Sequence, residues 1–484
     1  MSAAEALPLT STHEGQMREI LRRQRAAHIK DGAPSAEKRI EWLDKAIALV
    51  FDHKDQIAEA LREDFGHRSV HATMLTDVAS SIAPLKHAKA HVRSWMKREK
   101  RKVNPAILGL LGARAYVEYQ PKGVVGIISP WNFPVNLTFA PLAGVLAAGN
   151  RTMIKPSEFT PRTGELMARM FRSAFDETEI AVFTGGAEVG SAFSKLPFDH
   201  LLFTGATSIA YHVMRAAAEN LVPTTLELGG KSPVIVSRTA DMKLTANRMM
   251  MGKTMNAGQI CLAPDYVFVP KEKTREFVTA VEGAVTTMFP TLKDNPDYTS
   301  VINQRHYDRL MGYIDDARAK GAEIIEINPA KENFTQQPYY KIPPTLVLNT
   351  TDDMAIMKDE IFGPLLPIKT YDKVEEAIDY VNDHDRPLGL YYFGKDGKEE
   401  EQVLTRTTSG GVTVNDVIMH ISMEDLPFGG TGPSGMGSYH GIDGFRTFSH
   451  AKAVYQQASP DITAMMRPPY GKGFMRIVGS QIKK

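Results

Sequence analysis

The sequence predicts an α/β protein with a doubly wound parallel sheet, a second α/β block and a small β arm. Short apolar runs alternate with helical patterns from residue 122 to 227, and the alternation resumes between 228 and 414. This spacing is typical of parallel sheets joined by helical crossovers. The segment 113–121 instead alternates polar and apolar residues, as an exposed strand does. A chain of 484 residues, 43% of them hydrophobic, is long enough for two or three such domains. It is neither a disordered chain nor a disulfide-rich mini-protein.

The first half of the chain is expected to hold two long helices, the arm and the first sheet. The helices are expected at 36–64 and 70–102, the second with a break or first turn at Pro84. Apolar runs predict the strands of the first sheet at 124–129, 152–155, 180–184, 200–203 and 224–227. Between them the pattern predicts helices at 138–148, 161–175, 189–195 and 209–219.

The second block repeats this alternation with less regular spacing. Its expected strands lie at 233–236, 265–269 and 322–327, and its expected helices at 271–288 and 303–320. The residues after 414 are rich in glycine and predict loops and short elements. The chain is therefore divided into 1–226, interrupted by the arm at 113–121, then 227–414, and finally 415–484.

Charge and targeting patterns exclude several partners. The 57 Lys and Arg residues against 56 Asp and Glu leave a net charge of +1, so no nucleic-acid partner is expected. The basic run from Lys97 to Lys102 is interpreted as the solvated end of a helix. The polar N-terminus does not resemble a signal peptide, and no apolar run is long enough to span a bilayer. A cytoplasmic protein without a membrane anchor is expected.

Three apparent ligand motifs fail on their context. The segment 229–232 resembles the end of a phosphate-binding loop, but Thr225 stands where that loop needs glycine. The glycines of 430–435 fit a dinucleotide pattern, yet Pro433 interrupts it and no clear strand precedes it. Two histidine pairs within 67–91 have helical spacing but lack the glutamate of a zinc protease motif. No metal site is predicted.

Cys261 is the only cysteine, so no intrachain disulfide forms. Alone, it would be interpreted as an inert core residue. The small and amide residues at 256–260, however, form a turn able to present backbone N–H groups to a reacting oxygen. Two partners for a nucleophilic thiol lie upstream: Asn132, at a strand end, as an oxyanion donor, and Glu227, among apolar residues, as a general base. Taken alone, Asn132 also fits a capping residue and Glu227 a buried structural carboxyl group.

Six motifs between 130 and 364 resemble the signature set of the NAD(P)-dependent aldehyde dehydrogenase superfamily, in its order: PWNFP, KPSE, FTGATS, LELGGK, NAGQIC and EIFGP. The late segments LPFGGTGPSGMGSYHG and FRTFSH resemble the class 3-like branch, which includes fatty, aromatic and bacterial coniferyl aldehyde dehydrogenases. The resemblance covers nearly the whole chain. It implies a Rossmann-like cofactor domain at 1–226, a catalytic domain at 227–414, and a segment 415–484 that closes the active site and supports oligomerisation.

The resemblance also implies a role for each site residue. Cys261 would attack the aldehyde carbon, while the Asn132 side chain and the Cys261 N–H would hold the oxyanion. Glu227 would deprotonate the water that hydrolyses the thioester to a carboxylic acid. The cofactor-binding positions that it implies are Pro130, Trp131, Lys155, Ser157, Glu158, Gly205, Ser208, Glu360 and Phe362.

Cofactor choice and partners follow from the same resemblance. NAD is expected to be preferred and NADP to be usable, because Glu158 would face the extra phosphate of NADP. The substrate is expected to be an aromatic or a medium- to long-chain aliphatic aldehyde, and the protein to be a homodimer. Ala210 replaces the usual last glycine of the phosphate-binding turn and is expected to tighten the approach of helix to sheet. The expected substrate tunnel comprises Phe133, Tyr266, Met419, Ile421 and Phe428.

Two other functions are compatible with this fold. A CoA-acylating aldehyde dehydrogenase passes the thioester to a thiol, which requires no water-activating base, so Glu227 argues against it. A non-catalytic binding protein would be expected to lose Cys261 or Glu227, and both are present.

Overall fold

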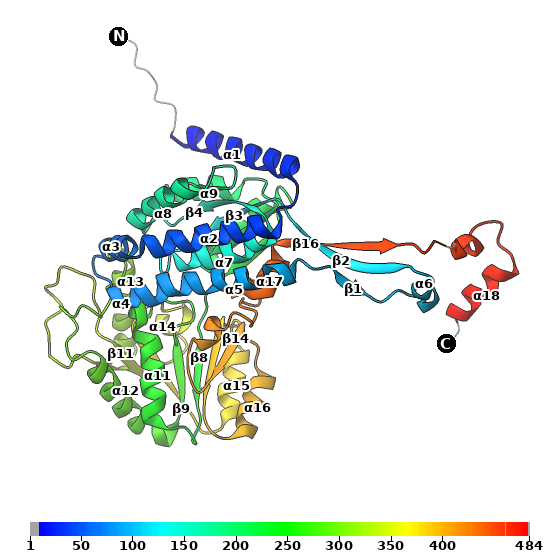
Figure 1. The fold of residues 1–484 in the computed structure, drawn as a ribbon. Coiled ribbons are helices and arrows are strands. Elements are labelled where there is room, and N and C mark those ends of the chain that lie inside the picture. Colours follow the sequence, from blue (N-terminus) through cyan, green and yellow to red (C-terminus); the bar gives the residue numbers. More distant parts are fainter. Residues whose placement is uncertain (1–8, 460, 483–484) are drawn as a thin grey trace, which may run out of the picture.

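The computed structural model describes residues 9–459 and 461–482 and contains three sheets. Two are the large sheets of the body, and the third forms a long arm that projects from it (Figure 1). An α/β architecture with a small β arm is therefore confirmed. The ends of the first predicted domain (1–8) and of the C-terminal segment (483–484) lie outside the described residues.

The first large sheet has six strands in the order β15-β7-β6-β3-β4-β5. Its five parallel strands fall where apolar runs predict them: β3 (Val124–Ile128), β4 (Arg151–Lys155), β5 (Ile180–Val182), β6 (His200–Thr204) and β7 (Thr224–Glu227). The sixth strand, β15 (Gly435–Met436), comes from the C-terminal segment and pairs antiparallel with β7. The strand order reverses between β3 and β6, because the chain passes from β3 to β4 and β5 and then returns to the other side of β3.

Helices cover both faces of this sheet, because successive side chains of a strand point to opposite faces. Val125 and Ile127 pack against one helical layer, and Val124 packs against another. The first layer contains α2 (Ala36–Asp52), α5 (Ser80–Trp95), α7 (Asn136–Ala148) and α8 (Pro161–Ala174). The second contains α1 (Leu9–Asp31), α9 (Ala187–Ser194) and α10 (Thr207–Ala218).

The second large sheet has seven strands in the order β10-β11-β12-β9-β8-β13-β14, with only β10 antiparallel. The strands are β8 (Pro233–Val236), β9 (Tyr266–Pro270), β10 (Glu323–Glu326), β11 (Thr345–Leu348), β12 (Leu365–Tyr371), β13 (Gly389–Phe393) and β14 (Gly411–Val414). Its flanking helices are α11 (Met242–Thr254), α12 (Thr274–Met288), α13 (Gln304–Ala319), α14 (Ala355–Lys358), α15 (Val374–Asn382) and α16 (Gly397–Arg406). The chain changes sheets between Glu227 and Pro233, beside the division drawn at 226/227.

The predicted helix boundaries near the N-terminus are wrong in two places. The segment 36–64 forms two helices, α2 and α3 (Lys54–Asp64), which meet at His53. The segment 70–102 contains α4 (Val70–Thr73), a π-helical turn η1 (Met74–Ala79) and α5, which keeps Pro84 inside it. The basic run is not a helix end, because residues Glu99–Arg101 form strand β1.

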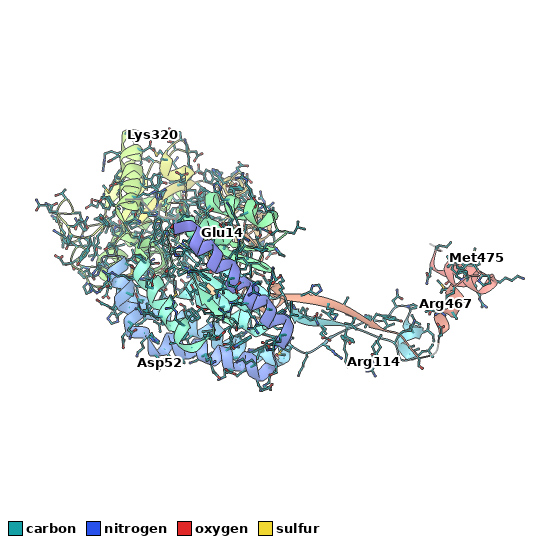
Figure 2. All side chains as sticks on the ribbon, turned by 90° about the horizontal axis from the view of Figure 1, so that it is seen from above. Glu14, Asp52, Arg114, Lys320, Arg467 and Met475 are labelled. Carbon is teal, nitrogen blue, oxygen red and sulfur yellow. The ribbon has the colours of Figure 1, made fainter. Side chains whose placement is uncertain are left out.

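The arm is a three-stranded antiparallel sheet rather than a lone strand or hairpin. Strand β2 (Arg114–Pro121) pairs along its whole length with β16 (Ser449–Gln456), and β1 covers it from the other edge. At the far end of the arm lie α6 (Ala106–Leu110) and the C-terminal helix α18 (Lys472–Gln481) (Figure 1). Seen from above, Arg114, Arg467 and Met475 are all far from the body (Figure 2).

The C-terminal segment 415–484 is not a separate body. Strand β15 joins the first sheet and β16 joins the arm, while α17 (Gly441–Thr447) contacts α7. Short 3-10 turns complete it at Met419–Ser422 and Ile462–Met466. Among the described residues, no helix is long and apolar enough to cross a membrane.

Candidate active site

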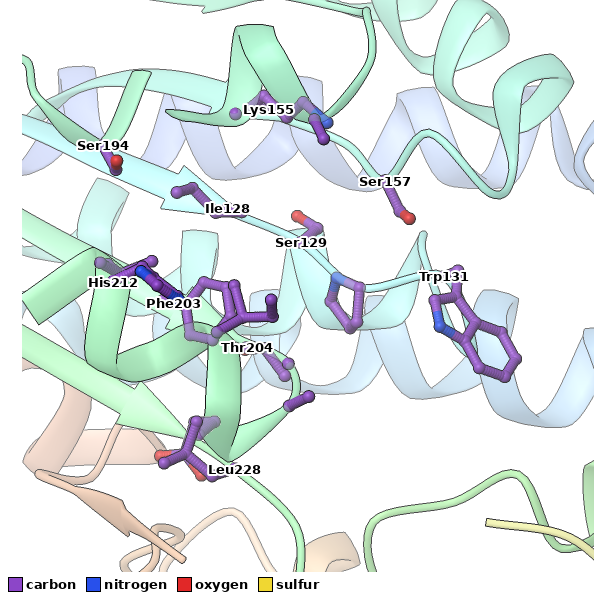
Figure 3. Close-up of a pocket in the computed structure, with 18 of the residues that line it drawn as sticks. Ile128, Ser129, Trp131, Lys155, Ser157, Ser194, Phe203, Thr204, His212 and Leu228 are labelled. Carbon is purple, nitrogen blue, oxygen red and sulfur yellow. The ribbon is translucent and has the colours of Figure 1, made fainter. Parts of the chain in front are cut away.

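A cavity of about 750 Å³ opens at the carboxyl ends of β3, β4, β6 and β7. In open α/β sheets ligands bind at this edge, where the strand order reverses. Figure 3 shows Lys155 and Ser157 on the β4 side of the Ile128–Ser129 strand end, with Phe203 and Thr204 on the β6 side. The predicted residues that line the cavity are Pro130, Trp131, Asn132, Lys155, Ser157, Glu158, Gly205, Glu227, Cys261, Glu360 and Phe362.

Cys261 follows a turn held in an unfavourable backbone conformation. Asn256 and Ala257 have φ of 49° and 51°, and Gly258 has φ of 73°. For a residue with a Cβ this left-handed region costs about 1–2 kcal/mol, and such strain persists only where surrounding contacts enforce it. The Gln259 side chain supplies contacts, donating to the carbonyl oxygens of Asn256 (2.9 Å) and Ser300 (3.0 Å). The turn therefore fixes the position of the thiol.

The amide of Asn132 faces this turn. Its Nδ2 donates to the Gln259 carbonyl oxygen at 3.1 Å, and the Nδ2 of Asn256 donates to the Asn132 carbonyl oxygen at 3.3 Å. An amide nitrogen carries two donors, so Asn132 keeps a second N–H besides the one that reaches Gln259. The structure thus joins the end of β3 to the cysteine turn, although 129 residues separate Asn132 from Cys261 in the sequence.

Two carboxyl groups lie in the same cavity without enough partners to stay ionised. Glu227, the last residue of β7, is buried, and neither of its side-chain oxygens accepts a hydrogen bond. Burial raises the pKa of Glu227 well above its usual range. Burial and the charge of Asp265 raise the pKa of Glu360 to about 8, although the Gly230 N–H and Lys231 oppose this shift. A carboxyl group with a raised pKa is suited to act as a base near neutral pH.

The thiol itself is held in its neutral form in the ligand-free cavity. Burial raises the pKa of Cys261, and the neighbouring carboxyl groups of Glu360 and Glu227 raise it further, while its own backbone N–H and that of Leu262 lower it. Formation of the thiolate therefore requires a proton acceptor at the site.

The end of the cavity away from Cys261 is lined first by an ion pair and then by apolar side chains. Lys155 is buried, and its Nζ donates to Glu158 Oε2 at 2.9 Å. Burial, the largest single influence, would raise the pKa of Glu158, but the hydrogen bond and the charge of Lys155, together with a backbone N–H, outweigh it and lower the pKa. Beyond this pair, Ile209 and Val213 of α10 line the cavity. An ion pair beside an apolar wall suits a ribose followed by a flat purine ring.

Two observations test whether a dinucleotide fits this cavity. Glu360 Oε1 is buried, lines the cavity and has no partner, so it can accept a hydrogen bond from a ribose hydroxyl. A Cβ on Gly229 would lie 2.2 Å from the same oxygen, so glycine is required there to seat this carboxyl group. Among the described residues, no group of three or more His, Cys, Asp or Glu side chains is placed to hold a metal ion.

Some predicted positions differ from the structure. Ser208 is exposed in the first turn of α10 and does not line the cavity. Tyr266 is not a tunnel residue, because it packs against Phe268 and Tyr380 in the core of the second sheet. Ala210 is buried on the sheet side of a regular α10.

Phe133 and Phe428 are buried in the core cluster that Cys261 packs against, whereas Met419 is partly exposed. The lining residues that sequence reasoning missed include Phe159, His212, Arg215, His306 and Arg309. His306 and Arg309 share the polar first half of α13, which was the signal available, but that helix has no motif linking it to a distant sheet edge.

A dinucleotide-sized crevice with a thiol, an amide and buried carboxyl groups defines a nucleotide-dependent oxidoreductase. The model of the aldehyde dehydrogenase family matches residues 8–454. The chain belongs to the aldehyde dehydrogenase family, whose members oxidise aldehydes with NAD(P)⁺. It is 66% identical to a probable coniferyl aldehyde dehydrogenase of Caulobacter vibrioides, over 98% of both chains. It is 55% identical to the coniferyl aldehyde dehydrogenase of a Pseudomonas species, over 94% of both.

Solved structures agree with this assignment of the fold. A substrate-bound Staphylococcus aureus AldH superposes with a TM-score of 0.90 at 35% identity, covering 96% of this chain and 99% of that one. The NAD⁺ complex of an aldehyde dehydrogenase from Bacillus cereus superposes with a TM-score of 0.81 at 26% identity, covering 92% and 89%.

Proposed function

We propose that Cys261, Asn132 and Glu227 carry out the oxidation of the aldehyde to a carboxylic acid. The carrying observation is that a strained cysteine turn, an amide with a spare N–H and a carboxyl group without partners meet in one cavity. Each supplies one of the three parts that acyl transfer through a thiol requires.

The first half of the reaction joins the sulfur to the aldehyde. The Cys261 thiol gives up its proton to water, and the sulfur attacks the carbonyl carbon to form a thiohemiacetal. The Asn132 side chain and the Cys261 backbone N–H donate to the oxygen as it gains charge. A nicotinamide cofactor, held by Lys155, Glu158 and Glu360, supplies the hydride acceptor when bound. Loss of the hydride leaves a thioester on Cys261.

The second half releases the acid. Glu227 takes a proton from water, the resulting hydroxide adds to the thioester carbon, and the carbon–sulfur bond breaks. The carboxylic acid leaves, and the thiol regains a proton. The raised pKa of Glu227 makes this carboxyl group a stronger base than an ordinary glutamate.

For the substrate we propose an aromatic aldehyde of the coniferaldehyde type, with medium- or long-chain aliphatic aldehydes as weaker substrates. The two relatives named for coniferyl aldehyde support this, since they match almost the whole chain.

We further propose that NAD is preferred over NADP and that the protein is a homodimer. Glu158 places a negative charge where NADP would add a phosphate, while Lys155 offsets part of that charge. The arm carries an open strand edge on β16, and such an edge accepts a second chain. The segment 415–484 is expected to support this dimer through β16 and α18.

A substrate and product panel tests this proposal. kcat/KM is measured for coniferaldehyde, benzaldehyde, hexanal, decanal and succinic semialdehyde, with NAD and with NADP, by absorbance at 340 nm. The free acid should form at the same rate with or without CoA, and coniferaldehyde should have the highest kcat/KM. An acyl-CoA product would contradict the role of Glu227, and a preference for succinic semialdehyde would contradict the substrate class.

A further inference from the structure

A buried ion pair lies between the N-terminal helices and the strand end that carries Asn132. Arg68 Nη2 and Asp77 Oδ2 are 2.5 Å apart, and the two side chains are 1% and 0% exposed. Removing two charges from water costs several kcal/mol per ion, which their attraction repays only when further hydrogen bonds are made. The partners of these further hydrogen bonds therefore show what the pair holds in place.

Those further hydrogen bonds converge on the segment around Asn132. Arg68 Nη1 donates to the Asn132 carbonyl oxygen at 2.6 Å. Asp77 Oδ1 accepts from the backbone N–H of Val135 at 3.2 Å and of Asn136 at 3.4 Å, where α7 begins. The ion pair thus contacts the backbone at Asn132 and again three to four residues later.

These contacts hold a segment, around Asn132, that belongs to no helix or strand. Asn132 lies beyond the end of β3 and before α7, so regular secondary structure does not fix it. Its carbonyl oxygen instead accepts from two side chains, Arg68 and Asn256 of the cysteine turn. The guanidinium group also lies over the rings of Phe65 and Phe133, at 4.7 and 5.2 Å from their centroids.

The backbone around Asp77 is itself unusual. Residues Met74–Ala79 form a π-helical turn between α4 and α5, and Asp77 lies within it. π-Helical turns inside α-helices are rare and occur often at functional sites. Here the turn places the Asp77 carboxylate against the start of α7 and within hydrogen-bond distance of the Arg68 guanidinium.

We propose that Arg68 and Asp77 are positioning residues for the oxyanion donor: they hold the backbone of Asn132 so that its side-chain amide stays against the cysteine turn, in the cavity that Cys261 lines. Neither residue lines the cavity, so both act through Asn132. The proposal rests on the assignment of Asn132 as the oxyanion donor. A small misplacement of such a donor can cost about a hundredfold in rate.

A double-mutant cycle tests the proposal. The variant Arg68→Met/Asp77→Asn removes both charges together, so no buried ion is left unpaired, and the new amide oxygen can still accept from Val135. We expect kcat to fall about ten- to a hundredfold, with the Kd for NAD changed by less than about twofold. In an Asn132→Ala background the same pair of changes should lower kcat by no more than about twofold, because the donor is already absent.

Controls separate positioning from structure. Arg39 is a second buried arginine, which donates to the Ala147 carbonyl oxygen at the other end of α7. Arg39→Met should lower Tm, and its effect on kcat should be the same with and without Asn132. Arg68→Lys keeps the charge but offers no bidentate fork, so it should give an intermediate kcat and serves if the double variant does not fold.

The outcomes distinguish two failures. In the first, Asn132→Ala lowers kcat by more than about a hundredfold, and Arg68→Met/Asp77→Asn lowers kcat by the same factor with Asn132 absent as with it present. The ion pair is then merely structural, and this inference is overturned. If Asn132→Ala leaves kcat within about threefold, Asn132 is not the oxyanion donor. The proposed mechanism then fails at that residue, and the positioning role fails with it.

Discussion

The catalytic cavity and the tip of the arm both contain groups without partners, but of opposite kinds. In the cavity, Glu227 and Glu360 are polar groups withdrawn from water without enough hydrogen bonds. At the arm tip, apolar side chains are exposed to water: Leu110 of α6 is 83% exposed and Met475 of α18 is 64% exposed. Helix α18 has no buried residue among those described.

The contrast shows what each region needs to be complete. An unpartnered buried carboxyl group raises the free energy of the protein until a small polar molecule or a proton satisfies it. An exposed apolar cluster on a projecting arm is satisfied only by another surface. The tip has a small core of its own, with Leu108, Ala113 and Ala458 buried together, so the arm holds its form while its outer face stays uncovered. The cavity is therefore suited to a small polar ligand, and the arm tip to the partner chain of the proposed homodimer.

The largest effect is expected at the thiol. Cys261→Ala should lower the rate of aldehyde oxidation by at least about a thousandfold, because covalent catalysis is lost. Binding of NAD, measured by calorimetry, should remain within about threefold of wild type. In the wild type, iodoacetamide should alkylate one site. The protein should stay folded without bound NAD. Residual turnover above about a thousandth of wild type would remove Cys261 from the role of nucleophile.

Glu227→Gln comes next, with an expected loss of about a hundredfold or more in steady-state turnover. The amide cannot accept the proton of water, so thioester hydrolysis should slow more than hydride transfer. A burst of NADH should then precede a slow steady state in stopped-flow traces. Since the pKa of Glu227 is raised, the wild-type rate should increase with pH through that pKa, and the variant should lose this limb. Equal loss of burst and steady state would place Glu227 earlier, at the activation of Cys261.

Charged substitutions at the arm tip test whether the arm forms the proposed dimer interface. Leu110→Asp with Met475→Asp should raise the dimer dissociation constant by about a hundredfold or more, since burying each apolar side chain is worth about 1.5–3 kcal/mol. Analytical ultracentrifugation at micromolar protein measures this. Phe51→Asp is the matched control, because Phe51 is an exposed apolar residue beside Asp52, which lies on the far side of the body from the arm tip (Figure 2). A wild type that sediments as a monomer would exclude the proposed dimer.

The same two regions show how far sequence reasoning reaches. Strands β3 to β7 were predicted within a few residues, because buried parallel strands form apolar runs bounded by glycine and polar turns. The cavity residues were predicted because each belongs to a short sequence motif, some at strand ends and others, such as Cys261 and Glu360, in loops. The arm was predicted only as β2, since β16 is more than 300 residues away and nothing local indicates that the two pair.

Two further features, helix α1 and the Arg68–Asp77 ion pair, were not predicted because local sequence patterns do not show contacts with distant segments. Helix α1 was not predicted, although Met17 and Leu21 pack against the first sheet, because its polar sequence has only a narrow apolar stripe. The Arg68–Asp77 pair was not predicted either: a buried arginine and aspartate look like surface residues in a sequence. Local patterns therefore predict elements and motifs, whereas contacts between distant segments appear only in three dimensions.

A smaller effect is expected on the pH dependence of stability. Glu360 has a pKa of about 8 in the folded protein and an ordinary value of 4.5 when unfolded. Between these values the folded state binds more protons than the unfolded state, so the free energy of unfolding falls as pH rises from 4.5 to 8. Glu360→Gln should remove this decline, whose ceiling is about 1.4 kcal/mol per pH unit.

Urea denaturation of the ligand-free protein at several pH values measures that difference. The exposed carboxylate Glu165 on α8 provides the control, since Glu165→Gln should leave the slope unchanged. If the free energy of unfolding of Glu360→Gln has the same dependence on pH as that of the wild type, the pKa of Glu360 is not raised in the folded protein without ligand.

The smallest effect concerns cofactor choice and depends on the ion pair at the far end of the cavity. Glu158 repels the extra phosphate of NADP, but Lys155 lies 2.9 Å from it and screens that charge. The Glu158 side chain is also partly open to water, which weakens the repulsion further. The remaining penalty is about 1–2 kcal/mol, or roughly ten- to thirtyfold in Kd.

Glu158→Gln removes the negative charge and leaves the buried Lys155 ammonium without its partner, so NADP should bind about tenfold better while NAD changes little. Calorimetric titration of both cofactors, with Glu165→Gln as the control, measures the ratio. An unchanged ratio would mean that another residue of the cavity wall sets cofactor choice, and Arg215 of α10 is one cationic lining residue that could do so.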